Sequence, residues 1–413
     1  MGREMERLRR ARAHLAPAPA AALPEPQPQP AWQLAARRRA LALPNRGPIE
    51  LDPATGRLAP RVLDALNDLG FYVFTGVASP AELADLRTDL DHVLGRSATI
   101  ERHDRGHDNI RADADARIRT ADATIDDRLR AAPDGWFGMA PPLSDPDGGL
   151  GRSPSKMQPG TPADGAPEMV MRSASRFFEY SEAGIRLYGH PRLLAVGASI
   201  CGEDFAPDGG GESIQIKLPG LGPAVAWHQD GTTHWEDDGS TADHCSHGFN
   251  FMLQLTGCDE TNAVYVLPGS HATLRRFDIP ALLEAQGVAG GDVLADAVPI
   301  IAGPGDVAVC FRNALHCSFP NASQELRVTF NFGFHKREWV EAEWGADTVA
   351  ARRTVVPIAM NSRRERFPEE EKSFQFRAPH PYAGREPSGV PEWQWDGWGG
   401  AAGRAMATPR LSL

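Results

Sequence analysis

Apolar residues along this chain follow two periods, helical in the first part and strand-like in the second. Residues 60–69 carry apolar side chains at helical spacing and are followed by Gly70, which predicts a helix with a glycine end. Residues 71–77 have the composition of a strand. Ser79 and Glu82, on either side of Pro80, form a capping box ahead of an apolar stripe that continues to residue 94. This pattern predicts a second helix.

From residue 213 onward the pattern changes to short apolar runs separated by glycine and proline. The runs are 213–218, 224–229, 249–255, 263–267, 306–311 and 327–334. Short strands with turn residues between them are typical of a sandwich or barrel, and not of a parallel sheet with crossover helices. The predicted fold class is therefore mainly β with flanking helices.

Composition divides the chain into three regions. Residues 1–50 are rich in proline and alanine and are predicted to be a flexible tail, in which Arg37, Arg38 and Arg39 are expected to be solvated. Residues 51–340 are predicted to form one catalytic domain with a polar insertion at about 101–135. Residues 341–413, which end in a tryptophan-rich segment, are expected to be an extension that packs on the core or on a partner subunit.

Charge and cysteine content narrow the classes of partner. The formal net charge of -11 argues against nucleic acid and anionic lipid, which bind basic surfaces. No apolar run has the roughly 20 residues of a membrane-spanning helix, and the N-terminus lacks the apolar centre of a signal peptide. Five cysteines without a Cys-x-x-Cys pair favour a reducing compartment, so the expected location is the cytoplasm. A homo-oligomer is left open.

A metal site is predicted from two short segments. His228 and Asp230 are two residues apart at the end of a predicted strand, where alternate side chains share a face. This pair alone is weak, but His316, which follows the apolar run 306–311, offers a third ligand. Two histidines and one carboxylate leave three octahedral positions open, as in non-haem iron(II) oxygenases, whereas structural zinc prefers a closed tetrahedral site.

Arg327 begins the last predicted strand, a short distance after His316. Alternation places Arg327, Thr329 and Asn331 on one face of this strand and its valine and phenylalanines on the other. A guanidinium on the polar face could bind one carboxylate of a dicarboxylic acid through two hydrogen bonds. The alternative is an ordinary surface arginine at a strand end. The shared spacing with His316 favours the first interpretation.

These segments together resemble the phytanoyl-CoA dioxygenase family. The resemblance covers about residues 60–335, and the segments that carry it are Gly70-Phe71-Tyr72-Val73, Trp227-His228-Gln229-Asp230-Gly231, Val266-Leu267-Pro268-Gly269-Ser270-His271, Pro304-Gly305-Asp306, and His316 with Arg327. It implies a double-stranded β-helix, a cupin-like jelly roll, that uses iron(II), 2-oxoglutarate and O₂.

The resemblance also implies roles for single residues. His228, Asp230 and His316 would be the catalytic iron ligands, and Arg327 would bind the 5-carboxylate of 2-oxoglutarate with help from the Ser318 hydroxyl. Weaker matches to co-substrate contacts are Phe251, Gln215 and Lys156.

The expected reaction is hydroxylation of an unactivated C–H bond in a small metabolite, with succinate and CO₂ as co-products. Basic residues Arg172, Arg176, Lys217 and Arg337 suggest a polar or anionic substrate. An acyl-CoA or carrier-bound intermediate is the alternative substrate class. From other classes, a metal-binding sensor, a cupin-like metalloprotein that does not use 2-oxoglutarate, and a protein hydroxylase remain open. Histidines and aspartates at 234–247 are better explained as a hydrophilic loop than as a second metal site.

Overall fold

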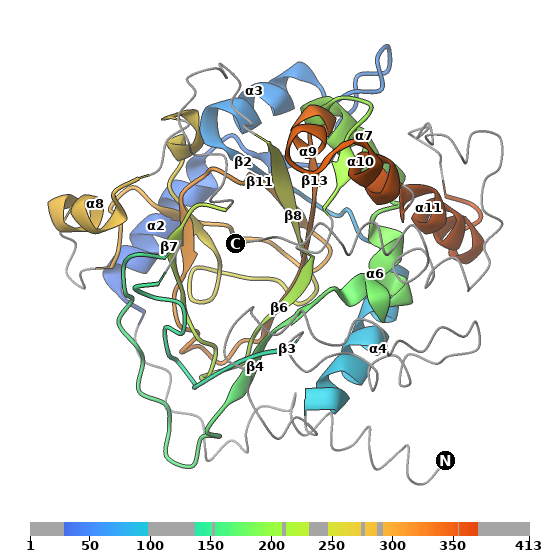
Figure 1. The fold of residues 1–413 in the computed structure, drawn as a ribbon. Coiled ribbons are helices and arrows are strands. Elements are labelled where there is room, and N and C mark those ends of the chain that lie inside the picture. The colour runs from blue at the N-terminus through green and yellow to red at the C-terminus, as the bar shows by residue number, and fades with distance from the viewer. Residues whose placement is uncertain are drawn as a thin grey trace, which may run out of the picture.

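The strands of this protein are divided between two facing sheets in the computed structural model (Figure 1). The structure describes residues 29–97, 137–150, 153–208, 212–230, 247–273, 277–286, 292–353 and 355–370. Within these ranges the larger sheet has nine strands: β1 (Arg46–Gly47), β2 (Phe71–Phe74), β3 (Phe137–Ala140), β4 (Val170–Ser175), β5 (Ala206–Pro207), β6 (Ser213–Lys217), β8 (Gly248–Gln254), β11 (Val307–Phe311) and β13 (Arg327–His335). The smaller sheet has four: β7 (Val225–His228), β9 (Tyr265–Val266), β10 (Val298–Pro299) and β12 (His316–Ser318).

From β6 onward the chain passes back and forth between the two sheets. Strands β6, β8, β11 and β13 join the larger sheet in the order β11-β8-β13-β6, and β7, β9, β10 and β12 join the smaller one in the order β10-β9-β12-β7. All of these neighbours are antiparallel. Eight strands divided between two antiparallel sheets in this way form a double-stranded β-helix, a jelly roll. The predicted fold class is confirmed, and each predicted run from residue 213 onward contains an observed strand.

The larger sheet has one apolar face and one polar face because its side chains alternate. Val328, Phe330 and Phe332 of β13 belong to a large buried cluster that includes alternate residues of β8 and β11 and the helices behind the sheet. On the other face, Arg327 contacts Ser318 and Asn250 contacts Asp230, so this face looks toward the smaller sheet. The space between the sheets is therefore polar around these residues, whereas Met252, Ala308 and Cys310 on the same face belong to an apolar cluster with Val266 of the smaller sheet.

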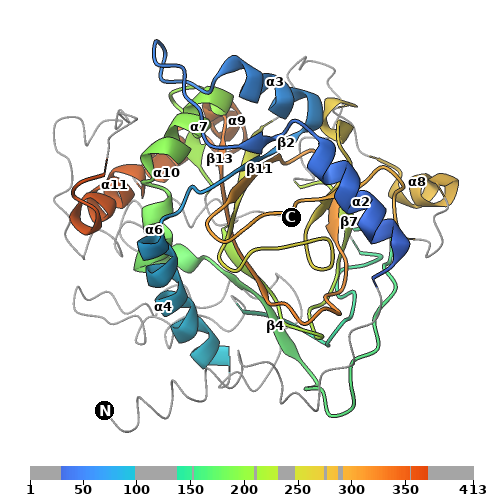
Figure 2. The same ribbon diagram turned by 180° about the vertical axis from the view of Figure 1, so that it is seen from behind.

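Helices cover the outer faces of both sheets (Figures 1 and 2). The α-helices are α2 (Ala31–Ala42), α3 (Pro60–Leu69), α4 (Pro80–Ser97), α6 (Glu182–Leu187), α7 (Pro191–Cys201), α8 (Ile279–Gln286), α9 (Arg337–Trp344), α10 (Ala346–Arg353) and α11 (Val355–Arg366), and the 3₁₀ turns are η3 (Phe177–Glu179) and η4 (Ser270–Thr273). The two helices predicted from the apolar pattern are α3 and α4. The predicted capping box is also confirmed, since Ser79 N donates to Glu82 Oε2 (2.9 Å) and Glu82 N donates to Ser79 Oγ (3.2 Å).

The prediction of a flexible tail is wrong for residues 29–50. Residues 31–42 form α2, whose Ala36 and Ala40 are buried, and Trp32 packs 5.1 Å from Phe319 between ring centroids. Arg37 forms a 2.6 Å ion pair with Glu260 and is not simply solvated. Proline-rich composition ends at Pro30, and the following alanine, leucine and arginine residues have high helix propensity. Residues 1–28 lie outside the described residues.

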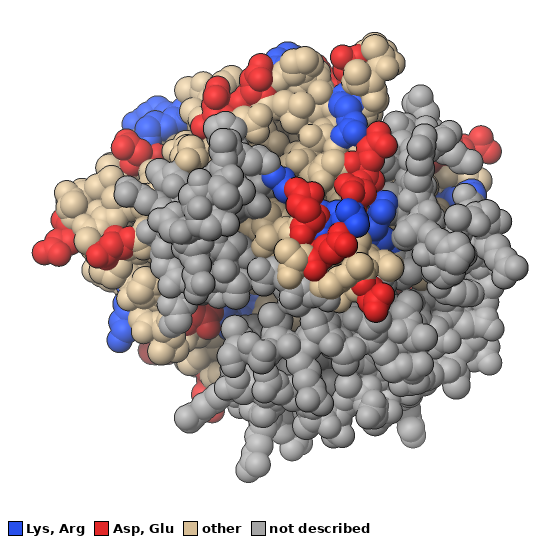
Figure 3. Space-filling view, turned by 45° about the horizontal axis from the view of Figure 1, so that its top comes forward, with Lys and Arg blue, Asp and Glu red and all other residues tan. Residues whose placement is uncertain are grey.

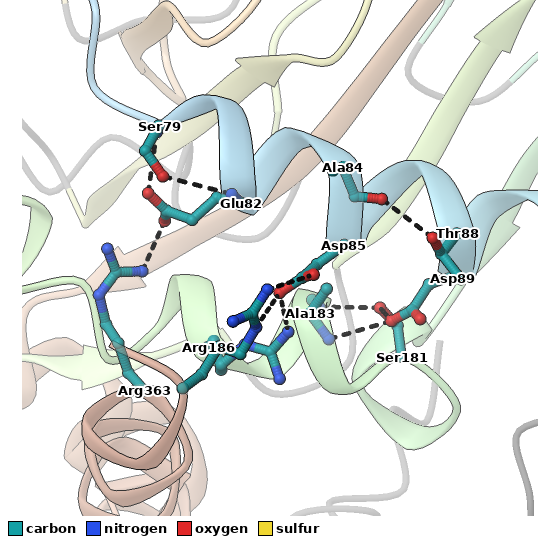
Figure 4. A network of polar contacts seen from close by, with 12 residues as sticks. Ser79, Glu82, Ala84, Asp85, Thr88, Asp89, Ser181, Ala183, Arg186 and Arg363 are labelled. Atoms are coloured by element: carbon teal, nitrogen blue, oxygen red, sulfur yellow. Dashed lines mark hydrogen bonds and ion pairs between the residues drawn. The ribbon is translucent and has the colours of Figure 1, made fainter. Parts of the chain in front are cut away.

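The described part of the C-terminal region packs on the helices that cover the larger sheet. Arg363 of α11 contacts Glu82 of α4, and Arg366 contacts Asp85, which also binds Arg186 of α6 (Figure 4). Residues 371–413, with the tryptophan-rich segment, and the polar insertion predicted at 101–135 lie outside the described residues.

The surface and the cysteines add two further facts. Acidic and basic side chains are interspersed on the described part of the face in Figure 3. Cys201, Cys258, Cys310 and Cys317 are buried free thiols. Among the described helices, none combines the length and apolar composition needed to cross a lipid bilayer.

Candidate metal centre

Three predicted metal ligands meet at one end of the smaller sheet. His228 is the last residue of β7 and His316 is the first of β12, and the two are directly opposite each other in these antiparallel strands. Asp230 follows β7 by two residues. His228 Nε2 lies 3.4 Å from Asp230 Oδ1, His316 Nε2 lies 3.8 Å from Asp230 Oδ2, and one donor atom from each residue lies within 4.8 Å of the others. The fold therefore brings together ligands that are far apart in the sequence.

Hydrogen bonds fix which nitrogen of each histidine faces the centre. Nδ1 of His228 lies 2.8 Å from the Ala226 carbonyl oxygen, and Nδ1 of His316 lies 2.9 Å from the Ala314 carbonyl oxygen. A carbonyl oxygen only accepts, so each Nδ1 must carry the proton and donate it. The lone pair of each neutral ring is then on Nε2, which points toward Asp230. This is the tautomer that a metal requires.

Asp230 is held by two hydrogen bonds, one from its backbone N–H and one to its carboxylate. Its backbone N–H donates to the Arg312 carbonyl oxygen (2.8 Å), and its Oδ2 accepts from Asn250 Nδ2 (2.7 Å). Asn250 lies on the polar face of β8. One oxygen of Asp230 is thus engaged by an amide, which orients the carboxylate and leaves Oδ1 directed at His228.

A buried ion pair lies behind Asn250. Arg312 Nη2 contacts Asp208 Oδ2 at 2.5 Å. Burial alone would raise the pKa of Asp208, but Arg312, His335 and Arg352 together outweigh burial, so this pKa is well below its ordinary value. Gly333 makes room for the pair, because a Cβ there would lie 3.1 Å from both Arg312 Nη2 and Asn250 Oδ1 and 2.2 Å from the Phe249 carbonyl oxygen. Asn250 is therefore held by tightly packed neighbours.

Gln229, between the two ligands of the first segment, points away from them and connects the surrounding loops. Its Nε2 donates to the Asn313 carbonyl oxygen (2.8 Å) and its Oε1 accepts from Phe277 N (3.1 Å). Asn313 in turn donates to the His271 carbonyl oxygen (2.7 Å), and the His271 ring fills the space that a side chain at Gly70 would occupy. His271 is thus a packing residue outside the metal centre.

Arg327 lies between the sheets, where the strand pattern predicted it. Only 4% of it is exposed, and Nη1 donates to the Asn262 carbonyl oxygen (2.8 Å) and to Ser318 Oγ (3.2 Å). Ser318 is two residues from His316 on β12, a separation of about 7 Å along a strand. Ser318 is therefore close to His316 along β12, and Arg327 contacts Ser318 from the larger sheet.

Phe251 is not at the site. It lies on the apolar face of β8, fully buried, with ring centroids 4.8 Å from Phe249 and 5.3 Å from Phe332. Because side chains alternate along β8, the neighbours Asn250 and Met252 face the space between the sheets and Phe251 faces the helices. The predicted role of Phe251 beside the co-substrate is wrong.

Gln215 and Lys156, the two other weak predictions, have different positions. Gln215 is opposite Thr329, on the polar face of β6, and its Nε2 donates to Ser213 Oγ (2.8 Å). Lys156 is exposed, with its side chain packed beside Gly149. Gln215 is thus placed on the face that bears Arg327, whereas the recorded contacts of Lys156 are with a surface turn.

Two of the basic residues expected near the substrate are already paired. Arg172 contacts Asp147 at 2.5 Å, and Arg337 contacts Glu341 at 2.6 Å. Of the loop considered for a second metal, residues 231–246 lie outside the described residues, and His247 packs on Trp339 with ring centroids 4.9 Å apart. In the described part of the chain, His228, Asp230 and His316 form the one cluster with metal-ligand geometry.

The donor set fits iron(II) and the arginine fits a carboxylate. Two Nε2 lone pairs and one carboxylate oxygen converge without a fourth protein ligand among the described residues, as an open six-coordinate ion requires. Arg327 is a buried cation, its recorded partners are neutral, and Nε has no hydrogen-bond partner among the described residues. A buried unpaired charge is costly, and an anionic ligand would remove that cost.

Solved structures and a family model are similar to parts of this chain. No curated protein matches the chain by sequence. Among solved structures, AviO1 from Streptomyces viridochromogenes Tue57 is 16% identical with a TM-score of 0.42, covering 70% of this chain and 96% of that one. EctD from S. alaskensis with bound Fe is 17% identical with a TM-score of 0.43, covering 70% and 80%. The carbocyclase SnoK from nogalamycin biosynthesis, described as non-heme and alpha ketoglutarate dependent, is 14% identical with a TM-score of 0.41, covering 68% and 85%.

These TM-scores are low, so the fold assignment rests on the strand order and not on these structures. The family model of phytanoyl-CoA dioxygenase matches residues 151–329, which include all three metal-ligand candidates, Ser318 and Arg327. This match and the His–Asp–His cluster support iron(II) as the metal and 2-oxoglutarate as the co-substrate. The similarity to the phytanoyl-CoA dioxygenase family thus covers residues 151–329.

Proposed function

We propose that this protein is an iron(II)- and 2-oxoglutarate-dependent dioxygenase that hydroxylates an unactivated C–H bond of a small polar metabolite and releases succinate and CO₂. The observation that carries the proposal is the position of Arg327. A buried arginine without an acidic partner in the described structure contacts Ser318, which is two residues from His316, so a dicarboxylate could reach the metal and the guanidinium together.

The residues of the chain would hold and orient the reactants. His228, Asp230 and His316 would bind iron(II), which with O₂ and the co-substrate supplies the oxidising chemistry. The carbonyl oxygens of Ala226 and Ala314 hold both rings in the metal-binding tautomer. Arg327 would fix the remote carboxylate of 2-oxoglutarate, which orients its other end toward the metal.

A polar substrate is favoured by the side chains on the inner face of the larger sheet. Asn250, Gln215 and Asn331 lie on this face, and the Oδ1 atom of Asn331 is buried without a hydrogen-bond partner among the described residues. A fatty acyl chain placed here would leave such groups unpaired, which is unfavourable, whereas a hydroxyl or amide group would pair with them. Arg172 and Arg337 are already paired with acidic residues, which favours a polar, uncharged substrate over an anionic one.

The test is anaerobic addition of iron(II) and then 2-oxoglutarate to the purified protein. Chelation of the metal by the 2-oxo acid is expected to produce a weak visible charge-transfer band in the wild type. The band should be lost in His228→Ala, which removes a ligand, and should need more 2-oxoglutarate in Arg327→Met. Lys156→Met, an exposed lysine, is the matched control and should behave as wild type.

A folded, metal-loaded wild type that gives no band would overturn the proposal and favour a metalloprotein that does not use 2-oxoglutarate. A band with unchanged 2-oxoglutarate dependence in Arg327→Met would remove the assigned role of that arginine. Substrates would then be screened by succinate release, with polar metabolites and acyl-CoA thioesters compared side by side.

A further inference from the structure

A second buried cation lies directly opposite Arg327. Lys217, the last residue of β6, is the Cα partner of Arg327 in antiparallel β13, so both side chains are on the face between the sheets. Lys217 is 3% exposed and Arg327 is 4% exposed. Two like charges in a directly opposed pair repel each other, and removal from water increases the cost.

The recorded partners of these two cations are neutral. Lys217 Nζ donates to the carbonyl oxygens of Ser318 (3.3 Å) and Phe319, and Arg327 donates to the Asn262 carbonyl oxygen and Ser318 Oγ. These contacts satisfy hydrogen-bonding groups but neutralise no charge. No ion pair from either residue to a carboxylate is recorded in the described part of the chain.

The titratable groups nearest to the pair do not supply a negative charge either. Burial raises the pKa of the Cys258 thiol to about 11 and that of Cys317 well above its ordinary value, so both thiols are neutral near pH 7. Burial lowers the pKa of Arg327 to about 10, and burial together with Arg327 lowers the pKa of Lys217 well below its ordinary value. Both shifts follow from burial of two neighbouring cations without a counter-anion among the described residues.

We propose that Lys217 and Arg327 form a two-cation site for the remote carboxylate of the co-substrate, with Lys217 as a binding residue contributed by β6. The inference rests on the proposed function, because it concerns the same co-substrate. The carboxylate would lie near Ser318, which both side chains contact, one strand repeat from His316. Its negative charge would remove the repulsion between the two cations.

This assignment makes two predictions with opposite signs for Lys217→Met, which keeps the length of the side chain and removes its charge. In manganese(II)-loaded protein, which binds 2-oxoglutarate without turnover, the dissociation constant measured by calorimetry should rise about tenfold or more, as expected for loss of a charged hydrogen bond. Without ligand, the urea midpoint should stay the same or rise, because one of two repelling charges is gone.

Two controls make the test specific to the remote carboxylate. For 2-oxopentanoate, in which a methyl group replaces that carboxylate, Lys217→Met and wild type should bind equally. Lys336→Met is the matched variant, since Lys336 is also buried but lies beyond the opposite end of β13, and it should bind 2-oxoglutarate as wild type does.

The outcomes separate this inference from the proposed function. If wild type binds 2-oxoglutarate and Lys217→Met binds it equally well, the two-cation site is refuted and the proposed function stands. If Lys217→Met lowers the urea midpoint and weakens both ligands alike, Lys217 has a structural role through the carbonyls of β12, and the inference also fails. If manganese-loaded wild type binds no 2-oxoglutarate, both fail together.

Discussion

Replacing Arg363 with methionine should destabilise the protein far more than the same change at Arg366. Both arginines are on α11 and both contact an acidic residue of α4. Figure 4 shows the contact of Arg363 with Glu82. The Arg363 side chain is 3% exposed and bonds Glu82 at 2.6 Å, whereas the Arg366 side chain is 48% exposed and bonds Asp85 at 2.9 Å. The two substitutions therefore compare the loss of a buried ion pair with the loss of an exposed one on the same helix.

The size of the effect follows from the burial of Glu82. Its side chain is 8% exposed, so removal of Arg363 leaves a carboxylate that water reaches poorly, and breaking a buried pair in this way costs about 3–5 kcal/mol. With an m-value of about 3 kcal/mol per M, the urea midpoint should fall by about 1 M or more. Arg366→Met should cause little change, because water and salt screen exposed pairs.

Equilibrium urea unfolding, followed by tryptophan fluorescence and circular dichroism, measures both variants. Coincident transitions in the two signals are required before a free energy is derived. Adding Glu82→Gln to Arg363→Met should restore part of the lost stability, because the uncompensated charge disappears. Equal midpoint shifts in the two single variants, or no recovery in the double variant, would refute this account of the C-terminal helix.

The pH dependence of this pair has a definite sign. Burial alone would raise the pKa of Glu82, but Arg363 outweighs it, and the pKa is lowered in the folded protein. The stability that Glu82 contributes is therefore complete above the ordinary pKa of a glutamate and is lost as the pH falls through the lower folded value. The unfolding free energy of Arg363→Met should therefore fall less on acidification than that of the wild type.

Three further predictions concern the metal centre, the apolar face and a buried histidine. Asn250→Ala should weaken metal binding by about 10- to 100-fold in a cobalt(II) titration, because the Asp230 carboxylate loses the amide that orients it; unchanged affinity would argue against that role. Phe251→Leu should cost about 1 kcal/mol in urea unfolding and leave 2-oxoglutarate affinity unaltered, and a weaker affinity would return Phe251 to the site. Burial lowers the pKa of His190 from 6.5 to about 3. Below about pH 6.5 the unfolded chain therefore binds a proton that the folded protein does not, and the free energy of unfolding falls. The loss in unfolding free energy between pH 7 and pH 5 should be smaller in His190→Leu, and an equal loss would refute the assignment.

The apolar runs predicted a sandwich or barrel, the family resemblance implied the jelly roll, and the spacing of short motifs indicated the three metal-ligand candidates. Strand boundaries follow from short apolar runs, and His228 and Asp230 share a face because they are two residues apart. The same rule could have corrected the prediction for Phe251. Phe249, Phe251 and Leu253 alternate with Asn250, Met252 and Gln254, so parity alone assigns Phe251 to the apolar face and Asn250 to the site.

Other features depend on pairing between distant segments and could not be predicted in this way. The opposition of Lys217 and Arg327 requires the register of β6 on β13, which no local pattern specifies. The ordering of α2 depends on the surface it covers, since its buried residues are small alanines and its basic residues find Glu260 and the Ala297 carbonyl oxygen only in the folded structure. Composition predicts the conformation of a segment in isolation, and these tertiary contacts are not part of it.

The opposition of His228 and His316 has a consequence for the integrity of the fold. Among the described residues, strand β7 is the outermost strand of the smaller sheet and pairs with β12 alone. An ion bound by both histidines would link β7 to β12 at this pair of residues. It would stabilise the edge of the sheet as a cross-link does. After loss of the ion, β7 would be the first strand to open locally, and its amide hydrogens would exchange with solvent faster than those of β13.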